Sequence, residues 1–102
     1  MTEVLAASEL WDGELRRVVV RGVPVLVVRL GGHVRAYRDV CPHLGAALSE
    51  GCLDGAVLTC GAHGWRFDLA TGCGVNPASA RLRPIAVAVR DGQVLVDVEE
   101  AA

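Results

Sequence analysis

The stretch Ile85-Ala86-Val87-Ala88-Val89-Arg90-Asp91-Gly92-Gln93-Val94-Leu95-Val96-Asp97-Val98 decides the fold class. Isoleucine and valine recur at every second position on both sides of Asp91-Gly92, which predicts two strands that each present one apolar face. Aspartate and glycine both tolerate the positive φ angles of a two-residue hairpin turn. The stretch therefore predicts a β-hairpin.

The same alternation upstream predicts three further strands, over Leu15–Val20, Val23–Leu30 and His33–Arg38. Arg21-Gly22 and Gly31-Gly32 separate these strands and have the composition of tight turns. One helical turn is expected over Ser8–Trp11, with Ser8 as its N-cap. Short strands joined by glycine-rich turns predict an all-β fold.

The pattern breaks between Asp39 and Pro77, where glycine occurs at positions 45, 51, 55, 61, 64, 72 and 74. Each glycine inside a regular strand costs backbone entropy, so we expect a set of tight loops that hold a ligand. We interpret residues 1–102 as one domain, with a ligand-binding subdomain at about residues 40–77.

Charge and hydropathy exclude several classes of protein. The net charge is −2, and the 10 basic residues, all arginine, form no basic run, so a nucleic-acid partner is not expected. The longest apolar run, Val23–Val28, is too short to span a membrane. The N-terminal residues Met1-Thr2-Glu3-Val4 lack the basic start of a signal peptide. We therefore expect a cytoplasmic protein without a disulfide framework.

Two motifs contain the residues that could bind a metal: Cys41-Pro42-His43-Leu44-Gly45 and Cys60-Gly61-Ala62-His63-Gly64-Trp65. Each motif contributes one cysteine and one histidine. Zinc fingers pair cysteine with cysteine and histidine with histidine, so a structural zinc site fits the spacing poorly. In a Rieske 2Fe–2S centre two cysteines hold one iron and two histidines hold the other, which the mixed pairs can supply.

On these two motifs the chain resembles the Rieske ferredoxin family over nearly its whole length. Leu48-Ser49-Glu50-Gly51 and Thr71-Gly72-Cys73-Gly74-Val75-Asn76-Pro77 are most similar to the ferredoxin component of toluene-type aromatic monooxygenases, and slightly less similar to that of ring-hydroxylating dioxygenases. The resemblance implies the Rieske iron–sulfur fold, with stacked antiparallel β-sheets and a small cluster-binding subdomain of loops. It also implies one Rieske-type 2Fe–2S cluster.

The same resemblance implies the residues of the site. The expected cluster and iron ligands are Cys41, His43, Cys60 and His63. The expected surroundings of the cluster are Pro42, Leu44, Gly45, Gly61, Gly64, Trp65 and Pro77. The glycines would let backbone N–H groups reach the sulfides, and Pro42 would stiffen the first loop.

The other residues of these loops have less specific expected roles. Trp65 and Phe67 are expected to pack beneath the second loop, and Leu44 either forms an apolar docking surface or is an ordinary loop leucine. Cys52 and Cys73 are expected to be small, partly buried hydrophobic residues.

Three positions indicate the redox potential. In respiratory-chain Rieske proteins a disulfide joins the two cluster loops and a serine donates a hydrogen bond to the cluster. The corresponding positions here are Ala46, Ala62 and Trp65. Fewer hydrogen bonds to the sulfurs leave the reduced state less stable, so we expect a potential near the low end of the range of about −150 to +300 mV.

The resemblance implies a one-electron carrier and not an enzyme. A monomer would pass electrons by transient docking from an NADH-dependent flavoprotein reductase to a terminal aromatic oxygenase. An oxygenase would need a further domain for mononuclear iron, for which no residues remain. Asp39, Glu50 and Asp54 either steer a basic partner or are ordinary solvated acids. A Rieske-fold small subunit of a nitrite reductase and a zinc-binding interaction module stay open as alternatives.

Overall fold

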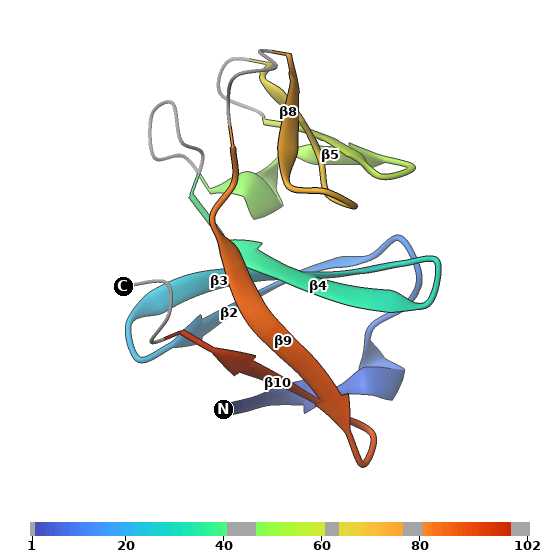
Figure 1. The fold of residues 1–102 in the computed structure, drawn as a ribbon, viewed down its shortest axis with the longest axis vertical. Helices are drawn as coiled ribbons and strands as arrows, with labels where there is room; N and C mark the ends of the chain where they lie inside the picture. The colour runs from blue at the N-terminus through green and yellow to red at the C-terminus, as the bar shows by residue number, and fades with distance from the viewer. Residues whose placement is uncertain (1, 41–46, 61–63, 77–80, 99–102) are drawn as a thin grey trace.

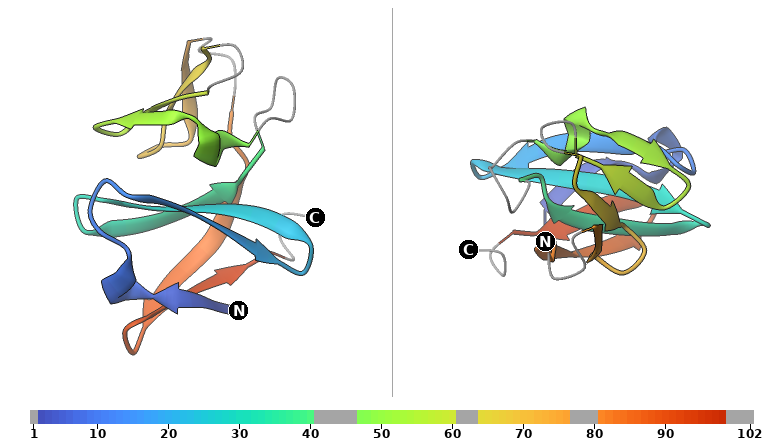
Figure 2. Two further views of the ribbon diagram at one scale, coloured as in Figure 1. Left: turned by 180° about the vertical axis from the view of Figure 1, so that it is seen from behind. Right: turned by 90° about the horizontal axis from the view of Figure 1, so that it is seen from above.

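Two antiparallel β-sheets, one above the other in Figure 1, make up the fold. The structure is a computed structural model that describes residues 2–40, 47–60, 64–76 and 81–98. The left view of Figure 2 shows the small sheet above the large sheet from behind, and in the right view, from above, the two sheets overlap. The prediction of an all-β fold with stacked antiparallel sheets is confirmed.

The large sheet has six strands in the order β1-β10-β9-β4-β3-β2. Their bounds are β1 Thr2–Ala6, β2 Leu15–Val20, β3 Val23–Leu30, β4 His33–Arg38, β9 Pro84–Arg90 and β10 Gln93–Asp97. The small sheet has four strands in the order β5-β6-β7-β8. Their bounds are β5 Cys52–Asp54, β6 Val57–Thr59, β7 Arg66–Asp68 and β8 Cys73–Asn76. Two 3₁₀ turns complete the described elements, η1 Ala7–Glu9 and η2 Leu48–Glu50.

Strand β3 separates two hydrophobic cores. Val25 and Val27 belong to the first core, which lies within the large sheet, whereas Leu26 and Val28 belong to the second. Successive side chains of a strand point to opposite faces, so β3 is buried on both sides. This double burial explains why its sequence is a continuous apolar run and not an alternating one.

The second core joins the two sheets. Its buried residues come from β3, β4, η2, β6, β7 and the segments beside them: Leu26, Val28, Tyr37, Leu48, Leu58, Cys60, Phe67, Leu69 and Leu82. A fully buried side chain of this size contributes about 1.5–3 kcal/mol relative to an exposed one. The small sheet has strands of only three or four residues, so this shared core is what holds it in place.

The strands predicted over Leu15–Val20, Val23–Leu30 and His33–Arg38 have these bounds in the structure, whereas the return strand of the C-terminal hairpin ends at Asp97, one residue before Val98. The C-terminal hairpin turns at Asp91 and Gly92, with φ values of 50° and 75°, and Arg21 and Gly22 turn in the same way between β2 and β3. Such turns match the twist of the flanking strands. Val89, near the end of β9, is 48% exposed.

Three expectations about the remaining elements were wrong or incomplete. The alternation did not predict β1 at the edge of the large sheet. The region between Asp39 and Pro77 is not loops alone, because β5–β8 lie within it. Its glycines at 55, 64 and 72 have positive φ and lie between these strands. Ser8 is not an N-cap, because η1 begins after Ala6 and has no side-chain cap.

The described part of the chain contains no helix long and apolar enough to cross a membrane.

Candidate metal centre

The structure describes one of the four predicted ligands, Cys60, and two of the residues expected around the cluster, Gly64 and Trp65. The other predicted site residues lie outside the described residues: Cys41, Pro42, His43, Leu44, Gly45, Gly61, His63 and Pro77.

Cys60 occupies a buried position at the start of the loop between β6 and β7. Its relative exposure is 1%, and its side chain belongs to the second core. The backbone N–H of Cys60 donates to the carbonyl of Trp65 at 2.7 Å, which extends the pairing of Thr59 with Arg66 by one step. The hairpin therefore fixes the backbone of Cys60 and keeps its thiol away from bulk water.

Gly64 closes the same loop. Its φ is +71°, a conformation that side chains other than glycine rarely adopt, and its N–H donates to the carbonyl of Cys60 at 3.0 Å. The sequence suggested that this N–H would be directed to a cluster sulfide. In the structure the N–H stabilises the loop on which Cys60 lies.

Trp65 and Phe67 pack together, and both contribute to the core that contains Cys60. Their ring centroids are 6.5 Å apart with planes tilted by 48°, a favourable aromatic arrangement. Phe67 is fully buried in the second core, and Trp65 is half-buried against it. Both rings thus fill the core under Cys60.

The segment after the first motif lies against the second motif. Leu48, in η2, and Cys60 share the second core. A Cβ added to Gly51 would collide with the carbonyl oxygen of Thr59, the residue before Cys60. This close approach of the two backbones requires glycine at position 51. It places Gly51, in the segment after the first motif, against Thr59, directly before the second motif.

Asp39, two residues before the first motif, was expected to be a solvated or partner-steering acid, and the structure contradicts both expectations. It is 1% exposed, and its carboxylate accepts three hydrogen bonds, two from Ser49 and one from Arg17. A buried and fully engaged carboxylate is not available to steer a partner. Glu50 and Asp54 are exposed, in keeping with either interpretation given for them.

Cys52, Cys73 and His33 differ in their exposure. Cys52, on the edge strand β5, is exposed, contrary to the expectation of partial burial. Cys73, on β8, is half-buried as predicted. His33 is exposed at the start of β4, also as predicted.

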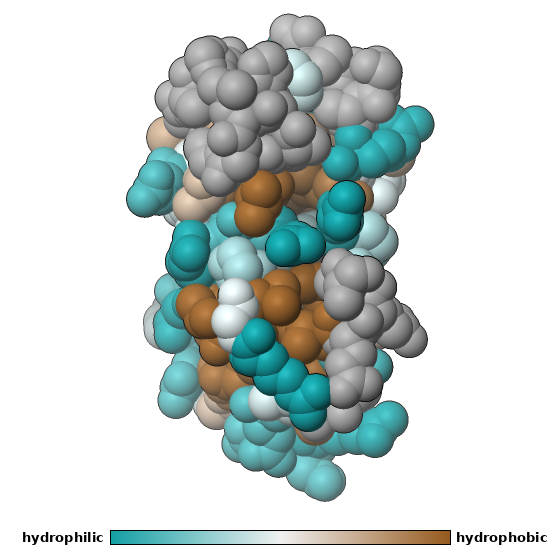
Figure 3. All heavy atoms as spheres, turned by 90° about the vertical axis from the view of Figure 1, so that its left-hand side faces the viewer, coloured by the Kyte–Doolittle hydropathy of each residue, from teal (hydrophilic) through white to brown (hydrophobic). Residues whose placement is uncertain are grey.

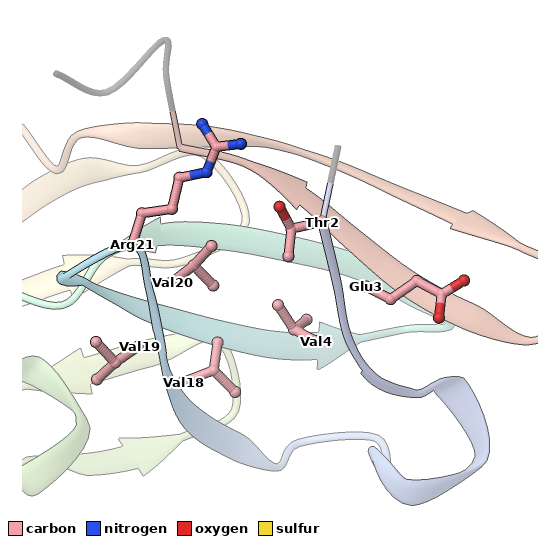
Figure 4. Close-up of a pocket in the computed structure, with 7 residues that line it drawn as sticks. All are labelled: Thr2, Glu3, Val4, Val18, Val19, Val20 and Arg21. Atoms are coloured by element: carbon pink, nitrogen blue, oxygen red, sulfur yellow. The ribbon is translucent and has the colours of Figure 1, made fainter.

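A pocket lies elsewhere, between the edge strands β1 and β2 (Figure 4). Its lining contains no cysteine or histidine and consists of Thr2, Glu3, Val4, Val18, Val19, Val20 and Arg21. One face of the molecule also shows apolar side chains gathered over the lower, large-sheet half (Figure 3). Because none of the predicted ligands lines this pocket, it is separate from the candidate metal centre.

The donor set fits an iron–sulfur cluster. Cys60 supplies a buried thiol at the base of a tight hairpin loop, and His63 follows three residues later in the same loop. A thiolate and an imidazole from one loop form half of the ligand set of a Rieske centre.

Comparison with known proteins identifies the family. The Rieske [2Fe-2S] domain family matches residues 1–91. The ferredoxin component of an alkene monooxygenase system from Xanthobacter autotrophicus is 40% identical over 98 residues, covering 95% of this chain and 80% of that protein. Ferredoxin CarAc from Metapseudomonas resinovorans is 40% identical over 100 residues, covering 96% and 94%.

A solved structure agrees with these relatives. The chain matches a chain in a complex of reduced oxygenase and oxidised ferredoxin of carbazole 1,9a-dioxygenase with a TM-score of 0.84 and 41% identity, covering 92% of this chain and 89% of that chain. The matches assign one Rieske-type 2Fe–2S cluster to the protein and favour it over a zinc site. The chain therefore belongs to the Rieske [2Fe-2S] domain family.

Proposed function

We propose that the protein is a one-electron carrier that takes electrons from an NADH-dependent flavoprotein reductase and passes them to a terminal aromatic oxygenase. The observation that supports this most strongly is the match, at 41% identity and over 89% of the matched chain, to the complex of oxygenase and ferredoxin. The relatives named as ferredoxin components of oxygenase systems are carriers and not catalysts, and the same role follows here.

The chain matches carriers over a larger share of their length than oxygenases. The chain covers 94% of a ferredoxin of carbazole 1,9a-dioxygenase from Nocardioides aromaticivorans at 31% identity. It covers only 29% of the terminal oxygenase from the same organism, at 29% identity. The similarity thus extends over nearly all of a carrier and over a small part of a catalyst.

Within this proposal, Cys41 and Cys60 hold one iron as thiolates, and His43 and His63 hold the other through imidazole nitrogens. The bound cluster supplies one-electron chemistry, and histidine ligation makes its reduction easier than that of an all-cysteine cluster. The chain's own residues fix the donors. The burial of Cys60 and the two backbone hydrogen bonds of its loop keep this thiol in place and restrict access of water to it.

We also propose that residues 1–102 act as a single Rieske domain, with a cluster-binding subdomain at about residues 40–77. The small sheet supports these bounds, since η2 and β5–β8 all lie between them, and η2, β5, β6 and β7 contribute side chains to the second core. A monomer that docks transiently and works in the cytoplasm fits a carrier that must meet two partners in turn.

Electron transfer between purified components tests the function. The chain, reduced under argon, is mixed in a stopped-flow instrument with an oxidised terminal oxygenase of the alkene monooxygenase or the carbazole dioxygenase type. Visible absorbance should report rapid reoxidation of the chain. In a second mixing experiment an NADH-dependent flavoprotein reductase should reduce the oxidised chain.

The control is Cys60→Ser, which should not form the cluster and should carry no electrons. A chain that binds its cluster but is neither reduced by such reductases nor oxidised by either oxygenase would contradict the proposal.

A further inference from the structure

The buried carboxylate of Asp39 connects three parts of the chain. Its Oδ1 accepts from the backbone N–H of Ser49 at 2.8 Å, and its Oδ2 accepts from the Ser49 hydroxyl at 2.6 Å. The guanidinium of Arg17, on β2, donates to Oδ2 at 3.2 Å. The side chain of Asp39 is 0% exposed, and that of Arg17 is 45% exposed.

Asp39 and Ser49 stand at the two ends of the segment that contains the first ligand motif. Asp39 precedes Cys41 by two residues, and Ser49 follows His43 by six. The carboxylate therefore joins the two ends of this segment directly, whereas Arg17 connects the junction to the edge strand of the large sheet.

Both ends are also fixed by the backbone. The N–H of Asp39 donates to the carbonyl of Pro24 at 2.9 Å, which extends the pairing of β4 with β3. On the other side, η2 is closed by hydrogen bonds from Glu50 to Ala47 and from Gly51 to Leu48, at 3.2 and 2.9 Å. The carboxylate thus joins two segments whose backbones are already held by hydrogen bonds.

A buried carboxylate is costly unless it is both paired and hydrogen-bonded, and hydrogen bonds to a charged group are among the strong ones. The arrangement satisfies this requirement, since three donors converge on one group. A fixed loop base also lowers the entropy that is lost when the residues within the loop take up a ligand.

We propose that Asp39 is a positioning residue for the cluster: with Ser49 and Arg17 it closes the base of the first ligand loop and so holds Cys41 and His43 in place for iron. This inference rests on the proposed function, because it assigns the first motif to cluster binding. Asp39 acts through the loop and does not itself contact iron.

The test compares Asp39→Asn and Ser49→Ala with Tyr37→Phe. The tyrosine variant removes a different buried hydrogen bond of the second core, between the Tyr37 hydroxyl and the carbonyl of Leu69. All three should be less stable than the wild type. If Asp39 has a purely structural role, Asp39→Asn and Tyr37→Phe should therefore give the same results in both measurements described below when their loss of stability is equal.

Two readouts report on positioning. The first is the rate at which an iron chelator removes iron from the intact holoprotein, measured at equal distance below each variant's melting temperature. The second is the electron paramagnetic resonance spectrum of the reduced protein. We expect Asp39→Asn to release iron about tenfold faster than Tyr37→Phe and to have a changed spectrum. Ser49→Ala keeps its backbone N–H and should show a smaller change in the same direction.

Equal release rates and unchanged spectra for Asp39→Asn and Tyr37→Phe would overturn the inference and leave the proposed function intact. If Asp39→Asn does not fold, Ser49→Ala is compared with Tyr37→Phe in its place, by the same two measurements. A wild-type protein that shows no Rieske-type signal would instead contradict the proposed function, so the two failures are distinguishable.

Discussion

The phenol of Tyr37 donates a hydrogen bond of 2.6 Å to the backbone carbonyl of Leu69. Tyr37 lies on β4 of the large sheet, and Leu69 directly follows β7 of the small sheet. Both residues are buried in the second core. This hydrogen bond therefore connects the large sheet to the small sheet.

Removal of the Tyr37 hydroxyl should weaken this connection. Tyr37→Phe leaves the carbonyl of Leu69 buried without its partner, which should lower the free energy of unfolding by about 1–3 kcal/mol. Urea unfolding monitored by circular dichroism measures the difference. Trp11→Phe is the control, because Trp11 is 75% exposed and its change should stay within about 0.5 kcal/mol. Equal midpoints for Tyr37→Phe and the wild type would contradict the assigned role.

Tyr37 should lose its proton at a higher pH than a tyrosine in the unfolded chain. Burial raises the pKa of Tyr37 above its usual value of 10.0, and the nearby Arg35 lowers it by a smaller amount. Because the unfolded chain ionises first, the stability that neutral Tyr37 contributes is complete below pH 10 and is lost as the pH rises through the folded-state pKa. The chain has a single tyrosine, so tyrosinate absorbance, taken as a difference from Tyr37→Phe, reports on it alone. A midpoint at or below pH 10 would be the opposite result.

Gly51 should not accept a methyl group. Its φ is −80°, so alanine is not strained there, but the added Cβ would overlap the carbonyl oxygen of Thr59. We expect Gly51→Ala to cost about 3 kcal/mol and to lower the iron content by displacing the residue before Cys60.

Gly55→Ala is the matched control for Gly51. Gly55 has a φ of +61° with no atom near the added Cβ, so alanine should cost about 1–2 kcal/mol through backbone strain alone. Its iron content should equal that of the wild type. Full iron content in Gly51→Ala would show that the close approach to Thr59 does not affect the metal centre.

Two cysteines should be dispensable. Cys52 is exposed on β5 and Cys73 is half-buried on β8, whereas Cys60 is buried. The double variant Cys52→Ala/Cys73→Ala should therefore keep the full iron and sulfide content, as measured by colorimetric assay and absorption spectrum. Loss of iron in this variant would show that one of the two takes part in the centre.

The sequence predicted β2, β3 and β4 at their observed bounds because two-residue turns delimit them. The small sheet was missed for a physical reason: strands of three or four residues are too short to show a period, and the glycines around them suggested loops. Asp39 was misjudged because its partners Ser49 and Arg17 are 10 and 22 residues away along the chain. Only the folded chain brings these three together.

The candidate site was predicted mainly by the chemistry of its donors. The mixed pairing of cysteine and histidine indicated a Rieske centre, and the family match agrees with it. The burial of Cys60 and the packing of Trp65 on Phe67 add geometry that the spacing could not supply. The four ligands and the low redox potential stay predictions.

The most direct test of the central claim is pulsed electron paramagnetic resonance on the reduced protein, combined with an iron assay. A Rieske centre held by Cys41, His43, Cys60 and His63 predicts a 2Fe–2S cluster whose spectrum contains couplings to two histidine nitrogens. His43→Cys and His63→Cys should each abolish one of these couplings. A colourless protein that contains zinc, or an iron–sulfur cluster without histidine nitrogen couplings, would contradict the account.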